Sequence, residues 1–378
     1  MISIEEVKTK KQQKEFIRFP LDLYRDNPCF VPPLYADEKA LFGKNRDEAC
    51  DFIFFLARKD GKTVGRIQGI LQKDANKKFG QKRVRFTRFD CIDDSEAAAA
   101  LFGAVENWAR SIGMNAVCGP LGCSDLEREG LLIEGFDRLS TFEEQYNAPY
   151  YRRLVEENGY AEEARWLEYL IYPADASRVE IHRKTADYVM RRYKLHYAEF
   201  SSKRDLISRY FDSFLAAVET AYSGLYGTVP FTEPMKKDLK STFRLVIDKR
   251  FVRIIVNEQN EVAFFELVFP SLSKALLHSG GHLTPRVLCR VLRALRRPEV
   301  LDFALVGVGD AYKNKGIGAI AIADLTEFMA QGTVRCAETN LCLVDNYPIQ
   351  NLWKNFPKEQ HKTRLAYVKR LTEDADDT

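Results

Sequence analysis

The spacing of apolar and polar residues predicts a series of strands and helices that occurs twice in the same order. In the first half, residues 52–58 and 63–72 are rich in aromatic and β-branched side chains, as strands are. The four residues between them contain an Asp-Gly pair, which is typical of a two-residue hairpin turn. We therefore expect these two strands to pair, and we expect a third strand at 83–92.

A helix is expected directly after the third strand. Asp93 and Asp94 offer oxygens that can cap the free N–H groups of a helix start, and Gly113 is a typical residue after a helix end. Residues 95–112 between them have apolar positions at helical spacing. The first half then continues with a strand at 115–119, a helix at 148–158 and a strand at 165–172.

The second half follows the same plan. Its expected strands are 195–200, 251–257, 262–269, 300–308, 335–343 and 364–371. Its expected helices lie within 205–247, at 316–330 and at 347–356. The polar, basic stretch around 175–195 separates the halves and predicts a domain at 1–180 and a second domain at 190–378.

The composition is that of an ordinary folded protein. The chain has 378 residues, 46% hydrophobic and 29% charged, which excludes a disordered or fibrous chain. Its 57 Lys and Arg nearly balance 54 Asp and Glu, so the total charge gives no footprint for nucleic acid. No stretch approaches the ~20 apolar residues of a membrane span, and the N-terminus lacks a signal-peptide pattern. We expect a soluble, cytoplasmic protein.

Cysteine and histidine give little sign of a metal site. The eight Cys contain no CxxC pair and lie mostly in apolar runs, which favours buried free thiols. His278 and His282 are close together in sequence, but no third or fourth ligand follows at a usual spacing. We therefore expect no metal.

Residues 305–319 carry the clearest chemical signal. An apolar strand runs into a basic turn that contains Gly316 and Gly318, and the turn opens a helix. Free N–H groups at a helix start, and the positive end of the helix dipole, attract an anion. Lys313 and Lys315 add positive charge. The pattern favours a phosphate site, although close packing of the strand on the helix explains the glycines as well.

This segment resembles a signature of the GNAT superfamily of N-acetyltransferases. Lys313-x-x-Gly316-x-Gly318 is similar to the family's pyrophosphate-binding motif, which has Gln or Arg in place of the Lys. The stretch at 346–356 resembles the family's second signature, an Asn-led helix that supplies an acid Tyr. Here Trp353 stands at the position of that Tyr, so the sequence departs from the family pattern at this point.

The first half resembles the same fold more loosely. Residues 146–160 look like an Asn-led helix ending in Gly and an aromatic residue, but Asp93 and Asp94 stand where a pyrophosphate would lie. The whole chain is similar to bacterial tandem GNAT-like proteins. The resemblance implies an α/β (α+β) fold of two GNAT-like domains, each a mixed, mostly antiparallel sheet flanked by helices. The first domain is expected to be degenerate in cofactor binding.

The resemblance also implies a function. That function is direct acyl transfer from acetyl-CoA, or another acyl-CoA, to an amine of a small molecule or peptide. The C-terminal domain is expected to bind the coenzyme, with the pantetheine arm along strand 300–308. The expected cofactor-binding residues are Val306, Val308, Lys313, Asn314, Lys315, Gly316, Ile317, Gly318, Asn346 and Asn351.

Attack by an amine requires a group that removes a proton. Glu338 is expected on the strand that flanks the acyl slot, and Glu266 lies in an apolar run that would raise the pKa of its carboxyl. For both carboxylates, solvent exposure or pairing with an Arg is the alternative. Tyr367 is a candidate acid, with core packing as the alternative.

Two other functions stay open at this point. A chain that keeps the fold without catalysis would be a non-catalytic CoA-binding or regulatory protein, and Trp353 at the acid position favours this alternative. Tandem GNAT-like halves also resemble peptidyltransferases that use aminoacyl-tRNA, although the near-neutral charge argues against a broad basic surface. The sequence does not indicate the acceptor, the acyl chain length or the oligomeric state.

Overall fold

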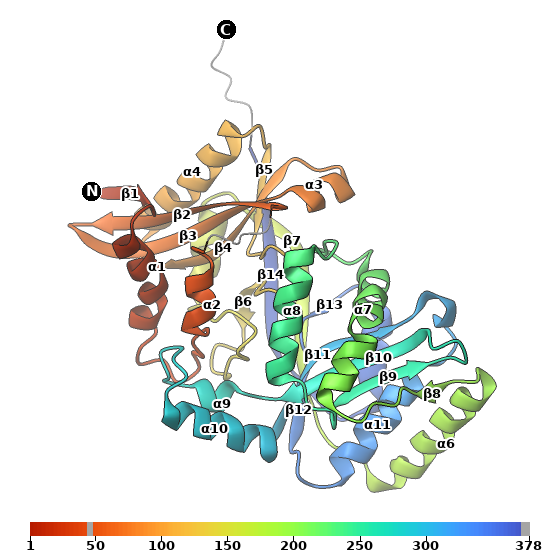
Figure 1. Cartoon of the computed structure of the whole chain (residues 1–378). Helices are drawn as coiled ribbons and strands as arrows, with labels where there is room; N and C mark the ends of the chain where they lie inside the picture. The colour runs from red at the N-terminus through yellow and green to blue at the C-terminus, as the bar shows by residue number, and fades with distance from the viewer. Residues whose placement is uncertain (44–47, 372–378) are drawn as a thin grey trace. The chain divides into compact units, whose positions relative to one another are not determined.

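A computed structural model of the whole chain describes residues 1–43 and 48–371 (Figure 1). The strands are β1 (Ile2–Glu6), β2 (Cys50–Lys59), β3 (Lys62–Gln72), β4 (Arg83–Cys91), β5 (Ala116–Gly119), β6 (Leu131–Glu134), β7 (Ala161–Ile171), β8 (His196–Tyr197), β9 (Val252–Val256), β10 (Val262–Pro270), β11 (Val300–Val308), β12 (Cys336–Glu338), β13 (Cys342–Leu343) and β14 (Lys358–Arg370). The helices are α1 (Lys10–Leu23), α2 (Tyr35–Ala40), α3 (Lys73–Phe79), α4 (Ser95–Ser111), α5 (Tyr151–Glu157), α6 (Ala176–Arg192), α7 (Lys203–Tyr222), α8 (Glu233–Val246), α9 (Ser273–Leu276), α10 (Pro285–Arg296), α11 (Gly318–Ala330) and α12 (Tyr347–Leu352).

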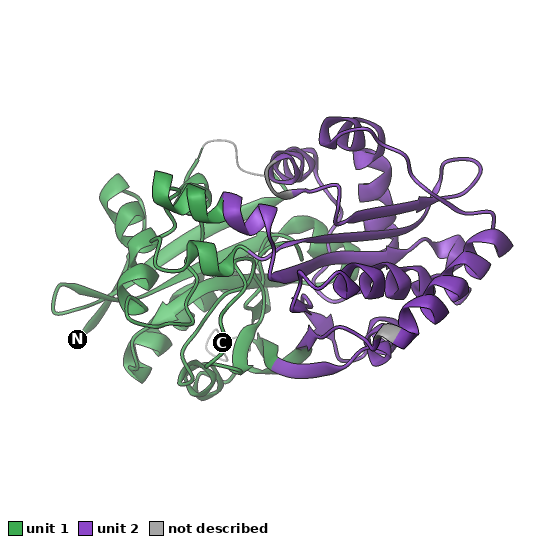
Figure 2. Cartoon of the chain, turned by 90° about the horizontal axis from the view of Figure 1, so that it is seen from below, with its two compact units in different colours: residues 1–166, 272–291, 362–378 green, residues 167–271, 292–361 purple. Residues whose placement is uncertain are grey.

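The chain divides into two compact units, coloured separately in Figure 2. Unit 1 contains residues 1–166, 272–291 and 362–378, and unit 2 contains residues 167–271 and 292–361. Each unit therefore combines segments that are far apart in the sequence. The division into contiguous domains at 1–180 and 190–378 stays a prediction.

Each unit is built on its own stretch of mixed, mostly antiparallel sheet. In unit 1 the strand order is β1-β2-β3-β4-β5-β14, and only β4 and β5 are parallel neighbours. In unit 2 the order is β7-β12-β11-β10-β9-β8, and only β11 and β12 are parallel neighbours. The fold class expected from the sequence is confirmed.

The strand beside each parallel pair comes from an unexpected part of the chain. In unit 1, β5 pairs with residues 367–370 of β14, at the end of the second half. In unit 2, β12 pairs with residues 170–171 of β7, at the end of the first half. The last strand of each half therefore completes a sheet that consists otherwise of strands from the other half.

The local signals explain the main elements. The β2–β3 hairpin turns at Asp60 and Gly61, whose φ angles of 50° and 76° suit the Asp-Gly pair. Asp94 caps α4 by accepting hydrogen bonds from the N–H groups of Glu96 and Ala97. The polar stretch at the expected boundary forms the helix α6, where Arg183 pairs with Asp324 of α11 at 2.8 Å.

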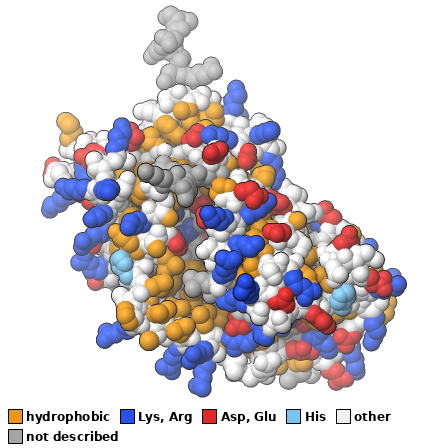
Figure 3. Space-filling view, in the orientation of Figure 1, with side chains coloured by type: hydrophobic (Ala, Val, Ile, Leu, Met, Phe, Trp, Pro, Cys, Tyr) orange, Lys and Arg blue, Asp and Glu red, His pale blue; other side chains and the backbone are white. Residues whose placement is uncertain are grey.

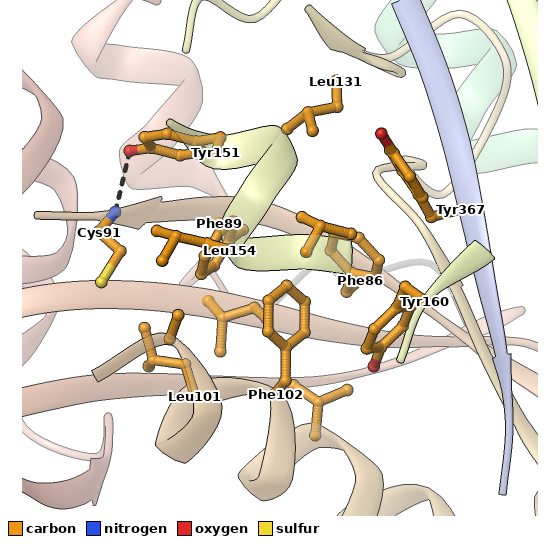
Figure 4. Close-up of a cluster of buried hydrophobic side chains, with 14 of the residues drawn as sticks. Phe86, Phe89, Cys91, Leu101, Phe102, Leu131, Tyr151, Leu154, Tyr160 and Tyr367 are labelled. Atoms are coloured by element: carbon orange, nitrogen blue, oxygen red, sulfur yellow. Dashed lines mark hydrogen bonds between the residues drawn. The ribbon is translucent and has the colours of Figure 1, made fainter. Parts of the chain in front are cut away.

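The core of unit 1 is rich in aromatic residues (Figure 4). The rings of Phe86 and Phe102 meet edge to face, with centroids 5.3 Å apart. The buried Tyr151 hydroxyl accepts hydrogen bonds from the Tyr24 hydroxyl at 2.6 Å and from the Cys91 N–H at 2.9 Å. This hydroxyl thus connects α1, β4 and α5 inside the core.

One pair of cysteines corrects the expectation of free thiols. Cys50 and Cys123 form a disulfide, with Cα atoms 6.7 Å apart and a sequence separation of 73. The fold brings β2 next to the loop after β5, which cysteine spacing alone does not reveal. The other six cysteines are free.

The Tyr151 hydroxyl gives a test of the unit 1 core. Tyr151→Phe removes the acceptor of two buried hydrogen bonds, so the free energy of unfolding should fall by ~1–3 kcal/mol. Urea unfolding of the full chain measures the change. Tyr347→Phe is the matched control, because Tyr347 is 69% exposed, and it should leave stability unchanged. Equal stability of both variants would contradict the role of the hydroxyl.

Candidate functional site

In unit 2 the parallel strands β11 and β12 pair over a short distance only. Their register runs from Val300 opposite Cys336 to Asp302 opposite Glu338, and β11 continues to Val308 paired with β10 but not with β12. The β10–β11 register shifts between Leu267 and Val268, which leaves Ala304 as an extra residue of β11. The second half of β11 thus has a backbone edge that β12 does not cover.

Side chains hydrogen-bond to this edge. The Val306 N–H donates to the Tyr222 hydroxyl at 3.1 Å, and that hydroxyl donates to the Val306 C=O at 3.0 Å. The Asn340 side-chain amide donates to the Ala304 C=O at 3.5 Å. Val306 therefore presents the N–H and C=O that an amide-bearing arm can use, and Tyr222, at the end of α7, occupies both.

The turn after β11 has the geometry of an anion site. Asn314 and Gly316 have φ angles of 61° and 76°, a conformation that suits Asn and Gly. Within the described chain, no backbone or side-chain oxygen accepts from the N–H groups of Asn314, Gly316, Ile317 and Gly318. These four donors lie at the N-terminus of α11, where the helix dipole is positive.

The two lysines of the turn are exposed and held differently. Lys315 has its ammonium 5.5 Å from the ring centroids of Tyr193 and Tyr312. Lys313 pairs with Asp310 at 2.5 Å. The Ile317 side chain is buried, so this residue offers only its backbone to an anion.

Helix α12 lies beside the turn. A Cβ placed on Gly318 would be 3.4 Å from Leu352 Cδ1, so this glycine permits close packing of the two helices. Asn346 is the N-cap residue of α12, and Asn351 lies exposed in its last turn. Trp353 is buried, with its ring centroid 4.9 Å from that of Phe303. It is a core residue.

Glu338 is the last residue of β12, where the pairing with β11 ends. Its Oε1 lies 3.3 Å from His361 Nε2. Glu168 completes a buried group of three whose ligand atoms all lie within 4.8 Å of one another. Such a group can relay a proton or hold a metal ion.

Glu266 belongs to a different place. It is buried on the central strand β10, and its neighbours are Asp324 and Arg253 rather than Glu338. The pKa of its carboxyl is raised to about 8, chiefly by burial and also by Asp324, while Arg253 opposes the shift. Among the described residues, its Oε2 has no hydrogen-bond partner. The structure thus does not bring the two candidate bases together.

Tyr367 lies in unit 1, within the core shown in Figure 4. It pairs with Gly119 across β14 and β5, and its hydroxyl donates to Glu156 at 3.4 Å. These contacts support core packing and give no support to a role as an acid, which stays a prediction.

Several residues of the site had no signal in the sequence. Tyr222 ends a helix more than 80 residues before Val306, and only the fold brings them together. Glu168 lies on β7, which pairs with β12, and His361 lies on β14, so only the fold brings them to Glu338. Asn340 is the exception among these residues. It lies two residues after Glu338, and this closeness in sequence to a candidate base could have indicated it.

No family model matches the chain. Among curated proteins it is 26% identical over 375 residues to Protein YghO of Escherichia coli, covering 96% of this chain and 94% of that one. It is 28% identical over 387 residues to the bacterial ceramide synthase of Caulobacter vibrioides, covering 98% of both.

Two solved structures share the fold. A tandem GNAT protein from the clavulanic acid biosynthesis pathway is 12% identical, with a TM-score of 0.56 over 99% of this chain and 100% of that one. A GCN5-related N-acetyltransferase from Sphaerobacter thermophilus is 12% identical, with a TM-score of 0.51 over 100% and 98%. The fold is therefore that of the GNAT N-acetyltransferases. More particularly, the chain has the fold of a tandem GNAT protein along its full length.

The buried Glu266 makes stability depend on pH. Its carboxyl has a pKa of about 8 in the folded protein and an ordinary value near 4.5 when unfolded. The folded state therefore keeps a proton that the unfolded state loses, and stability falls as pH rises through this window. Between pH 5 and pH 8, the free energy of unfolding of the wild type should fall by more than ~1 kcal/mol relative to that of Glu266→Gln. One unit of pKa shift is about 1.4 kcal/mol.

Urea unfolding at pH 5 and pH 8 measures this difference. Glu258→Gln, at the exposed turn between β9 and β10, is the control and should follow the wild type at both values. A pH dependence that is the same in the wild type and in Glu266→Gln would contradict the raised pKa.

Proposed function

We propose that the protein is an acyl-CoA-dependent N-acyltransferase that transfers an acyl group directly to an amine. The observation that carries the proposal is the combination, within unit 2, of an uncovered β11 edge with four N–H donors at the start of α11. The GNAT fold supports acyl transfer at this general level. The two features fit the two polar parts of one coenzyme, its amide-bearing arm and its pyrophosphate.

The cofactor-binding residues keep their expected roles in this proposal. The N–H and C=O of Val306, and Val308 beyond it, would hold the pantetheine arm. The turn at 313–318 would hold the pyrophosphate, with Asn346 and Asn351 at its border. Because Tyr222 occupies both polar groups of Val306, its hydroxyl has to leave that position when the arm binds.

The chemistry assigns distinct tasks to two groups. Glu338 takes a proton from the attacking amine, and His361, 3.3 Å away, can pass that proton on. A further backbone N–H on the uncovered edge of β11 can donate to the oxygen that becomes negative at the attacked carbonyl. Glu266 lies away from this edge, so we place it outside the reacting groups.

We favour a version of the proposal in which the acyl donor or the amine carries a long alkyl chain. One full-length relative is a ceramide synthase, and a ceramide is an amide of a long-chain base and a fatty acid. Unit 2 has a small apolar pocket, partly open to solvent, with a cavity volume of about 20 Å³. It is lined by Leu206, Ile207, Tyr210, Phe211, Phe214, Phe243, Ile247, Val252, Ile254 and Leu267.

The proposal includes a cytoplasmic location, where acyl-CoA is made, although the Cys50–Cys123 disulfide is unusual for that compartment. The non-catalytic alternative predicts CoA binding without turnover. The aminoacyl-tRNA alternative predicts no CoA binding. The two experiments below separate these functions.

The anion turn is tested by titration calorimetry with coenzyme A. Gly316→Asp places a carboxylate among the four N–H donors and should weaken binding by at least ~10-fold, because like charges repel. Gly316→Asn is the matched control, since Asn tolerates the same positive φ without charge, and it should bind within a few-fold of the wild type. Equal affinity of all three proteins would contradict the site, and no binding by the wild type would contradict the function.

Catalysis is tested by the release of the coenzyme thiol from palmitoyl-CoA and from acetyl-CoA, each with a long-chain amino alcohol such as sphinganine. Glu338→Gln should lower kcat by ~10²–10⁴-fold, the usual value of a general base, with a smaller effect on KM. Asp345→Asn, an exposed change seven residues away, is the control. Full activity of Glu338→Gln would exclude it as the base, and wild-type binding without thiol release would favour the non-catalytic alternative.

A further inference from the structure

Helix α10 leaves part of its apolar side exposed. Leu288 and Leu292 are 45% and 46% exposed, and Leu283, just before the helix, is 48% exposed. Leu288 and Leu292 are four residues apart, so they lie on the same side of the helix. Val287 is buried and anchors the helix to the protein. The exposed leucines are therefore a fixed feature of a packed helix.

These leucines are a cluster rather than scattered surface residues. Three of the nine large hydrophobic residues that are exposed in the described chain lie within these ten positions. Figure 3 shows hydrophobic side chains gathered at the lower left, where Figure 1 draws α9 and α10, with basic side chains along their lower edge. Single exposed leucines need no explanation, but a cluster with a charged border is typical of an interaction surface.

The polar side of α10 consists of arginine. Its four Arg and the Arg that directly follows it are all exposed, and none forms an ion pair with a described residue. They are Arg286, Arg290, Arg293, Arg296 and Arg297. Arg296 lies four residues after Leu292, so the exposed apolar line ends in a guanidinium. No described residue forms an ion pair that holds these cations.

The positive charge of the chain is concentrated here. Residues 271–298 contain six Lys and Arg and no Asp or Glu, whereas the rest of the chain has 51 basic residues against 54 acidic ones. A nearly neutral protein thus presents one basic apolar segment on an otherwise slightly acidic chain. A strongly basic border around exposed leucines matches an anionic, partly apolar partner.

We propose that α10, together with Leu283, is a docking surface for an anionic lipid bilayer. The leucines would enter the boundary between headgroups and acyl chains, and the arginines would reach the lipid phosphates. A helix that lies in the plane of the interface needs no membrane span, and among the described helices none has the length and apolar content to cross a bilayer. The surface does not depend on the proposed enzymatic function.

Vesicle co-sedimentation of the full chain tests the surface. The protein should bind vesicles of phosphatidylcholine mixed with phosphatidylglycerol, bind vesicles of phosphatidylcholine alone much more weakly, and lose affinity as salt is added. Replacing Arg290, Arg293 and Arg296 with Gln should weaken binding to the anionic vesicles on the order of 100-fold, about fivefold for each Arg lost. The experiment requires neither coenzyme nor acceptor, so its result is independent of catalysis.

The leucines are tested by Leu288→Asn with Leu292→Asn, which should weaken the same binding by at least ~10-fold. The matched control is Ile181→Asn with Tyr188→Asn, which removes two exposed apolar residues from α6 and should change nothing. Cys289 is a free, exposed thiol on α10, so a polarity-sensitive fluorophore attached there should shift to the blue on the anionic vesicles.

Three results would overturn the proposal. The first is absence of binding to either vesicle, and the second is binding that neither set of substitutions weakens. The third is a dimer in light scattering that the leucine variant abolishes, without vesicle binding, because a second copy of the chain would then cover the face.

Discussion

The candidate site depends on the end of pairing between β11 and β12. Beyond Asp302 and Glu338, β11 continues with an edge that no strand covers, and buried backbone groups must find other partners. In this structure the Tyr222 hydroxyl satisfies both groups of Val306. The proposed amide-bearing arm would use the same pair, so it would have to replace the Tyr222 hydroxyl there.

The rest of unit 2 follows from that opening. The parallel register places Glu338 where the strands separate, and β7 and the start of β14 bring Glu168 and His361 next to it. Strand β11 leads directly into the turn whose N–H groups have no acceptor. The polar edge, Glu338 and the candidate anion site thus come from consecutive parts of the same strand pair.

Much of the fold, and the turn after β11, could be predicted from the sequence, because the signals for these elements are local. The hairpin at Asp60, the capped helix after Asp94 and the glycine turn at Gly316 depend on neighbouring residues. The exchange of final strands could not be predicted. Strands β7 and β14 have similar patterns of apolar residues, and each pairs with a strand that is far away in sequence. For the same reason Tyr367 was expected in the C-terminal domain but lies in unit 1, and Tyr222 was missed.

The central claim is that an acyl-CoA binds along β11 and at the turn after it. Hydrogen exchange of the full chain with and without coenzyme A measures this most directly, because it reports on backbone N–H groups. The account predicts slower exchange at 303–308 and 313–318 in the presence of the coenzyme, and no change at 83–95, where Asp93 and Asp94 occupy the corresponding turn. Protection at 83–95 instead, or no protection anywhere, would contradict it.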